Sequence, residues 1–242
     1  MNSKFQAQTQ NEEIAYFNHL AKEGYYEPYP DHEYSRILFE MGFHMRDYKG
    51  LLLDVGCGSG AFSIRLAKLG FQVFGLDINL KMIKKAFQLA KENSLNADFL
   101  QADARMLPFK DDTFDYLFCG CILHHIPKHI PAFIKESRRI LKNDGEIFIF
   151  EPNILSPVSI YHYYLARKGS PNERPLLAYK IKKLLSKYGF YSIHISSIKK
   201  VQLKSSTSST LSKAHDLFLN IAVDYLKLPL GLYFIVTAKK LK

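Results

Sequence analysis

Three glycines on alternate positions, Gly56, Gly58 and Gly60, form the stretch of this 242-residue sequence that is best suited to ligand binding. They follow an apolar run that contains one acid, Asp54, and they precede helical apolar spacing over 61–69. Glycine lets the backbone approach a ligand closely, and the free N–H groups that open a helix favour electron-rich groups. The pattern predicts a buried parallel strand, a tight turn and a helix that bind a nucleotide-type ligand.

Acidic and histidine side chains recur where later predicted strands end. Asp77 closes the second predicted strand and Asp103 follows the third, while His124 and His125 follow the fourth. Because parallel strands end at the same edge of a sheet, we expect these side chains to be neighbours. Carboxylates accept hydrogen bonds from hydroxyl and amino groups, and a neutral imidazole can take a proton from a hydroxyl, phenol or amine. The sequence therefore predicts a ligand site with a candidate base.

Strand and helix patterns alternate along most of the chain, which predicts a doubly wound parallel sheet. The expected strands are 51–55, 72–77, 98–101, 116–121, 146–150, 190–198 and 232–238. The expected helices include 11–26, 31–45, 79–92, 176–188 and 213–227.

The order of these elements predicts the domain organisation. We expect N-terminal helices over 1–46, followed by the main α/β domain over 47–242, which carries an insertion at about 152–175 on the acceptor side. The two N-terminal helices are expected to lie over the carboxyl edge of the sheet as a lid. Tyrosines of this lid, among them Tyr25, are candidates for ligand contacts.

Composition favours a folded cytoplasmic protein. Hydrophobic residues make up 47% and aromatic residues 14% of the chain, which argues against extensive disorder. No run approaches the roughly 20 apolar residues of a membrane-spanning helix, and the N-terminus does not resemble a secretory signal. The three cysteines, Cys57, Cys119 and Cys121, are expected to be reduced thiols. The pair Cys119 and Cys121 lacks a second pair, so we predict no metal site.

The net charge of +10 is concentrated between residues 161 and 213. That stretch holds eleven Lys and Arg residues and a single acid, Glu173. Such a region suits phosphates, anionic substrates or an acidic membrane surface, and it equally suits solvated helix faces. Aromatic and basic residues do not interleave there as an RNA-stacking surface requires, so a nucleic-acid partner is possible but not favoured.

The glycine loop also fits a dinucleotide fingerprint, which is weak evidence alone. Asp54 on the first strand, the alternating glycines and Asp103 in its small-residue context disfavour NAD. In these features the chain resembles the class I S-adenosylmethionine-dependent methyltransferases, particularly their small-molecule branch. The matching stretches are LLLDVGCGSG at 51–60, GLD at 75–77, QADA at 101–104, LPF at 107–109, FDYLFCGCILHHI at 114–126 and LKNDGEIFIFEPN at 141–153.

The resemblance implies an α/β, Rossmann-like class I methyltransferase fold: a seven-stranded, mostly parallel sheet with its last strand antiparallel and helices on both faces. It implies S-adenosylmethionine as cofactor and S-adenosylhomocysteine as product. The residues it assigns to the cofactor are Asp54, Gly56, Cys57, Gly58, Gly60, Asp77, Ile78, Asp103, Ala104, Cys119 and Gly120. Asp77 is expected to accept from the ribose hydroxyls and Asp103 from the adenine amino group, with Met106 or Leu107 against the adenine face.

On the acceptor side, His125 or His124 is the candidate base. The residues expected to contact the acceptor are Tyr25, Glu151, Asn153 and Tyr161. The predicted function is methylation of a small metabolite, lipid-like or secondary-metabolite acceptor by a monomer or homodimer. Two alternatives stay open: a tRNA or RNA methyltransferase that uses the basic C-terminal third, and a cofactor-binding protein without catalysis.

Overall fold

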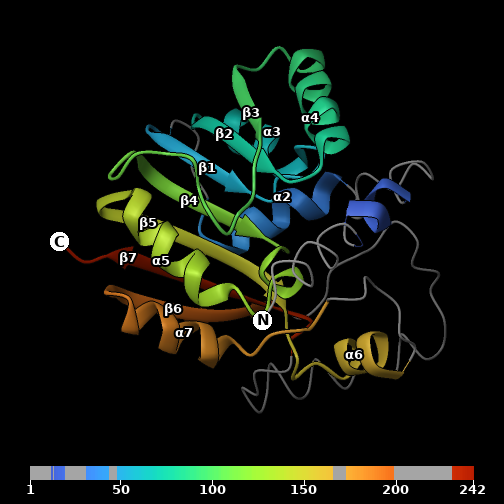
Figure 1. The fold of residues 1–242 in the computed structure, drawn as a ribbon, viewed down its shortest axis with the longest axis vertical. Coiled ribbons are helices and arrows are strands. Elements are labelled where there is room, and N and C mark those ends of the chain that lie inside the picture. Colours follow the sequence, from blue (N-terminus) through green and yellow to red (C-terminus); the bar gives the residue numbers. More distant parts are fainter. Residues whose placement is uncertain (1–11, 13, 20–30, 44–47, 166–172, 199–230) are drawn as a thin grey trace.

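The computed structural model describes residues 12, 14–19, 31–43, 48–165, 173–198 and 231–242. Their central feature is a seven-stranded sheet with the strand order β3-β2-β1-β4-β5-β7-β6 (Figure 1). The strands are β1 Leu51–Val55, β2 Gln72–Asp77, β3 Ala97–Gln101, β4 Phe114–Gly120, β5 Leu141–Pro152, β6 Phe190–Ile198 and β7 Tyr233–Lys240. The helices are α2 Asp31–Glu40, α3 Ala61–Lys68, α4 Leu80–Glu92, η1 Leu123–His125, α5 Ile130–Ile140, α6 Pro157–Ile160, η2 Tyr161–Leu165 and α7 Ala178–Lys187.

The sheet topology confirms the predicted fold class. The strands β1 to β5 pair in parallel, whereas β7 lies between β5 and β6 and pairs antiparallel with both. The five parallel strands therefore end at one edge of the sheet. The glycine loop and the segments after β2, β3 and β4 all begin at this carboxyl edge, where open α/β sheets bind their ligands.

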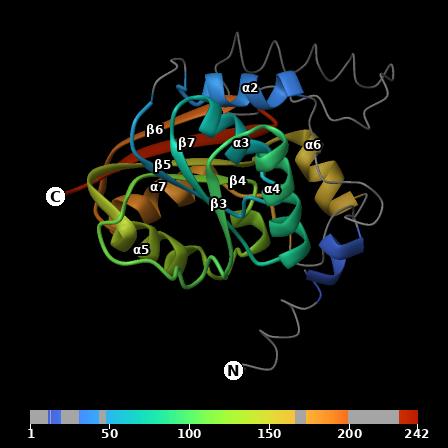
Figure 2. The same cartoon turned by 90° about the horizontal axis from the view of Figure 1, so that it is seen from above.

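Alternating side chains build a separate core on each face of the sheet. Leu52 and Phe118 point to the face covered by α2, α3 and α4, whereas their neighbours Leu53 and Cys119 point to the face covered by α5 and α7 (Figure 2). All four side chains are fully buried. Strands buried on both faces read as continuous apolar runs, which explains why the sequence around β1 shows no polar alternation.

The second N-terminal helix does not form the predicted lid. Tyr34 of α2 is buried against the ring of Phe62, with 4.9 Å between ring centroids. Just beyond α2, Phe43 packs on Phe71 before β2 and on Phe148 within β5. This helix therefore covers a face of the sheet, because its apolar residues match the apolar face and not the carboxyl edge. The first predicted helix is described at residues 14–19, which are helical.

Other boundaries differ modestly from the prediction. The strand expected over 146–150 begins earlier, because β5 also includes residues 141–145, where Asp144 has a φ of 61° and the register with β4 shifts. The helix expected over 213–227 lies outside the described residues, as do the tail 1–10 and Tyr25. Among the described residues, no helix has the length and apolar character needed to cross a membrane.

Candidate functional site

The glycine loop is tied to the end of β2 by backbone hydrogen bonds. The N–H groups of Gly56 and Cys57 donate to the Leu76 carbonyl at 2.7 and 3.0 Å. Gly56 has a φ of +71°, and a Cβ there would lie 2.5 Å from the side chain of Ile122. A Cβ on Gly58 would meet nothing within 4 Å, so open space lies over this part of the loop. The loop thus requires glycine for its backbone and leaves room above it.

Asp77 fixes this loop through its carboxylate. One oxygen accepts from the Gly58 N–H at 2.9 Å, and the other accepts from the Asn79 N–H at 2.8 Å. Burial raises the pKa of Asp77, and these N–H bonds partly oppose the rise. Because each carboxylate oxygen can accept more than one hydrogen bond, Asp77 retains capacity for the hydroxyls of a ligand.

Asp54 joins the two elements on either side of the glycine loop, β1 and α3. Its carboxylate is buried and accepts a hydrogen bond from the Ser63 hydroxyl of α3 at 2.5 Å. Burial raises the pKa of Asp54 to about 7, and the Ser63 bond opposes this rise. The sequence analysis did not identify Ser63, whose position one turn into a helix carries no signal of its own.

The other residues expected to bind the cofactor near the glycine loop can offer it mainly backbone groups. Cys57 and Cys119 are buried, and burial raises the pKa of both thiols, so neither is a reactive thiolate. The Ile78 carbonyl accepts from the side chain of Gln101 at 3.1 Å. Gly120 ends β4, where a Cβ would lie 2.8 Å from the ring of Phe118.

Asp103 is held by a neighbouring cation that the sequence analysis missed. Its carboxylate accepts from the backbone and from the guanidinium of Arg105. Burial disfavours the charged carboxylate, but the Arg105 contacts outweigh burial and lower the pKa of Asp103. Ala104 is buried beside it. Of the two expected adenine-facing residues, Met106 is 77% exposed whereas Leu107 is in the core, so only Met106 is placed to cover a ligand.

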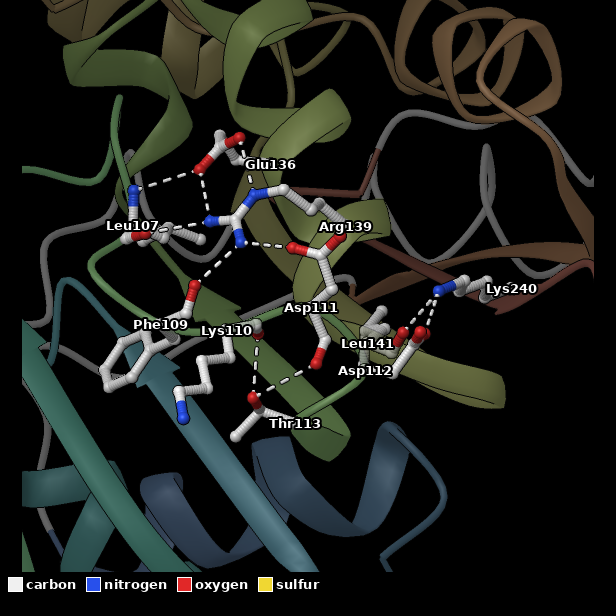
Figure 3. Close-up of polar contacts among 10 residues, drawn as sticks. All are labelled: Leu107, Phe109, Lys110, Asp111, Asp112, Thr113, Glu136, Arg139, Leu141 and Lys240. Carbon is white, nitrogen blue, oxygen red and sulfur yellow. Dashed lines mark hydrogen bonds and ion pairs between the residues drawn. The ribbon is translucent and has the colours of Figure 1, made fainter.

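Arg139 anchors the loop that follows Asp103 (Figure 3). Its guanidinium donates to the carbonyls of Leu107 and Phe109 at 2.9 and 2.7 Å, and it also pairs with Glu136 and Asp111. These contacts fix the loop to α5, so the position of Asp103 depends on a residue far along the chain.

Glu151 holds the loop after β4 and does not line an open acceptor site. Its carboxylate is fully buried and accepts from the N–H groups of Ile122 and Leu123 at 2.9 and 2.6 Å. The same carboxylate lies 2.6 Å from Nδ1 of His124. Glu151 therefore caps η1 and orients His124, in place of the acceptor contact that we expected.

His124 is a buried cation. Burial alone would lower its pKa, but the carboxylates of Glu151 and Glu173 outweigh burial and raise the pKa of His124 to about 9. The imidazole is consequently protonated at neutral pH, which contradicts its expected role as a base.

His125 packs against His124 and is slightly more exposed. Their ring centroids are 4.1 Å apart, and the ring of Phe17 meets His125 edge-on at 5.2 Å. Nε2 of His125 is 3.4 Å from a carboxylate oxygen of Glu173. The structure therefore joins both histidines with Glu173 and Phe17, two residues absent from the sequence-based site.

The other expected acceptor residues are dispersed. The Asn153 side chain is buried, donates to the Gly231 carbonyl at 3.0 Å and accepts from the Leu155 N–H at 3.1 Å, so it shapes the backbone. Tyr161 is 61% exposed. Tyr163, another aromatic residue of the expected insertion, lies near the histidines, with its ring centroid 6.4 Å from that of His124.

The buried His124–Glu151 pair makes stability depend on pH. Because folding raises the pKa of His124 from 6.5 to about 9, its stabilisation is complete below pH 6.5 and is lost as the pH rises through about 9. We expect the free energy of unfolding, measured by urea denaturation with a chelator present, to fall by on the order of 2 kcal/mol between about pH 7 and pH 9.

Glu151→Gln removes the carboxylate that raises this pKa, so the variant should show a much smaller fall. Equal slopes in both proteins would refute the assignment. Asp54→Asn is the matched control. Folding raises the pKa of Asp54 from 3.8 to about 7, so Asp54 changes the free energy of unfolding between these pH values and not between about pH 7 and pH 9.

The fold and the site together define a class of protein: a doubly wound α/β domain that binds its ligand at a glycine loop on the carboxyl edge. Residues 52–145 match the family model described as "Methyltransferase domain". The stretch that carries the glycine loop, Asp77 and both histidines is thus similar to a methyltransferase domain.

Individual relatives agree with this family. The chain is 32% identical over 119 residues to a demethylmenaquinone methyltransferase of Geobacillus sp. (46% of this chain and 50% of the relative). It is 41% identical over 98 residues to a ubiquinone biosynthesis O-methyltransferase of Pelagibacter ubique (40% of each chain). The chain spans about half the length of the curated relatives it matches, or less. A crystal structure of a SAM-dependent methyltransferase from Archaeoglobus fulgidus superposes with a TM-score of 0.62 over 86% of this chain and 92% of that one, at 22% identity.

Proposed function

We propose that this protein is an S-adenosylmethionine-dependent methyltransferase that acts on a small-molecule acceptor. The observation that supports it most is the arrangement of the glycine loop and Asp77. Two loop N–H groups bind the end of β2, Asp77 holds Gly58, and open space remains over Gly58. The loop is thus preformed, and the carboxylate of Asp77 beside it can accept hydrogen bonds. This arrangement suits a nucleoside with ribose hydroxyls.

Within this proposal, each described residue has a task that follows from its contacts. Asp77 accepts from the ribose hydroxyls, and Asp103, already neutralised by Arg105, accepts from the adenine amino group. Met106 covers the adenine face, while Asp54 and Ser63 keep the loop in place from below. The cofactor supplies a methyl group on a positively charged sulfur, so the chain's main contribution is to position the acceptor and exclude water.

The acceptor is proposed to lie over η1, beside His125, Phe17 and Tyr163. Of the two histidines, His125 is the candidate that acts on the acceptor, because His124 is already protonated. The aromatic rings near His125 favour a cyclic or apolar acceptor. The names of two relatives, which refer to demethylmenaquinone and to ubiquinone biosynthesis, agree with such a compound.

The described basic residues give the tRNA alternative little support. On α7, Ile181 and Leu185 are buried, whereas Lys180, Lys182 and Lys183 are exposed. This is the pattern of an amphipathic helix with a solvated basic face. Methylation of a small molecule is therefore the function we propose.

The experiment that tests this function is transfer of tritiated methyl groups from S-adenosylmethionine. The full chain is incubated with a small-metabolite extract, with quinol and phenol compounds, and separately with total tRNA. We expect label in organic-soluble small molecules. Label in tRNA alone would replace this function by the RNA alternative, and no label in any arm despite cofactor binding would favour a non-catalytic protein.

A further inference from the structure

We propose that His124, His125 and Glu173 bind a divalent transition-metal ion at the carboxyl edge of the sheet. One ligand atom from each of these residues lies within 4.8 Å of the other two. Two imidazole nitrogens and one carboxylate oxygen form a ligand set that Zn²⁺ prefers among common ions. The sequence did not predict this site, because Glu173 is distant from the histidines along the chain.

The distances suit an ion with little movement of the side chains. Nε2 of His125 and Nε2 of His124 lie 3.4 and 3.8 Å from the same oxygen of Glu173. Ligand bonds of about 2.0–2.2 Å at tetrahedral angles place ligand atoms roughly 3.3 Å apart. An ion between the three atoms would therefore take the place of the proton on Nε2 of His124, which is released to solvent, and would be coordinated directly by the two imidazoles and the carboxylate.

Glu151 gives His124 the orientation that a metal ligand needs. Its carboxylate contacts Nδ1 of His124 at 2.6 Å, which leaves Nε2 directed toward Glu173. Metal-binding histidines almost always donate their other ring N–H to a carboxylate, a carbonyl or water, and this contact fixes the tautomer. Glu151 also caps η1, so the imidazole is held by the backbone as well.

Backbone contacts bring Glu173 to the histidines. The N–H of Arg174, the next residue, donates to the His124 carbonyl at 2.9 Å. The side chains of His124, His125 and Glu173 are only 5%, 12% and 11% exposed. The three groups thus come from two segments that the fold fixes together, and they are shielded from water, which strengthens coordination of a cation.

The position of the ion suggests a role in binding the methyl acceptor. This role rests on the proposed function. Three protein ligands leave a coordination position for water or for an oxygen atom of the acceptor, as in catalytic zinc sites. Ile122, the residue before η1, lies against Gly56, which places this cluster beside the proposed cofactor site. The inferred ligand is therefore a divalent ion that binds an oxygen-bearing acceptor, with His125 as a metal ligand in place of a free base.

Calorimetric titration of the chelator-treated full chain with Zn²⁺ alone tests the site without any cofactor. We expect one ion per chain, and we expect Glu173→Gln and His125→Ala each to weaken binding about 10-fold or more. Co²⁺ should give visible absorption bands that Glu173→Gln abolishes. His194→Ala is the matched control, because His194 is an exposed histidine on β6.

Equal Zn²⁺ affinity in the wild-type chain and in Glu173→Gln, or loss of binding only in His194→Ala, would overturn the proposal, as would absence of binding to the wild-type chain. Circular dichroism of each variant shows whether it is folded, and Glu173→Gln changes one partly buried side chain without altering its size. Because no cofactor is present, failure of this site is distinguishable from failure of the methyltransferase assignment.

Discussion

Asp77→Ala is expected to weaken S-adenosylmethionine binding by about 100-fold or more. The substitution removes a charged acceptor from two ribose hydroxyls, and hydrogen bonds to charged groups contribute about 1.5–3 kcal/mol each. It also frees the N–H groups of Gly58 and Asn79, which the carboxylate now binds at 2.9 and 2.8 Å. The loss combines direct contacts with disorder of the glycine loop. Isothermal titration calorimetry measures it.

Two further variants separate these contributions. Asp77→Asn keeps one carbonyl acceptor of the same shape, so we expect it to lose about 10-fold, less than Asp77→Ala. Asp98→Ala is the matched control, because Asp98 is an exposed acid on β3 and should bind the cofactor like the wild-type chain. Unchanged affinity in Asp77→Ala would remove the cofactor site from this edge of the sheet.

His125→Ala is expected to lower turnover by about 100-fold or more while the dissociation constant for S-adenosylmethionine stays within about twofold. His125 contacts Glu173 and Phe17 on the proposed acceptor side, so its removal should affect turnover far more than cofactor affinity. Steady-state kcat with the best acceptor from the tritium assay, together with calorimetry, measures both quantities.

The same variant distinguishes two ways in which His125 can act. If it takes a proton directly, a chelator should leave the wild-type rate unchanged; if it binds an ion, the chelator should lower that rate to the level of His125→Ala. His194→Ala should match the wild-type chain in every arm. A wild-type rate for His125→Ala at all pH values would exclude this residue from the reaction.

The fold was largely predictable because its signals are local. The apolar run before Gly56 and the helical spacing after Gly60 each reflect one element, and the structure confirms the strand, turn and helix. The start of the helix expected over 79–92 is also confirmed, since the side chain of Asn79 caps it by accepting from the backbone of Lys81. Residues placed at strand ends, such as Asp77, followed from the parallel topology alone.

The parts that failed depend on contacts between distant segments. No local pattern shows that Glu151 caps η1 or that His124 lies between two carboxylates, because these contacts arise when β5 and the end of the insertion reach the loop after β4. Glu173 had one sequence signal, as the only acid between residues 161 and 213. An isolated acid among cations indicates a specific partner, and here the partners are the two histidines.

The central claim is that the glycine loop binds S-adenosylmethionine, and calorimetric titration of the full chain with S-adenosylmethionine, S-adenosylhomocysteine and NAD tests it most directly. We predict that both sulfur nucleotides bind, that NAD does not, and that Asp77→Ala weakens S-adenosylmethionine binding about 100-fold or more. Absence of binding by either sulfur nucleotide, or binding of NAD in their place, would contradict the account of this site.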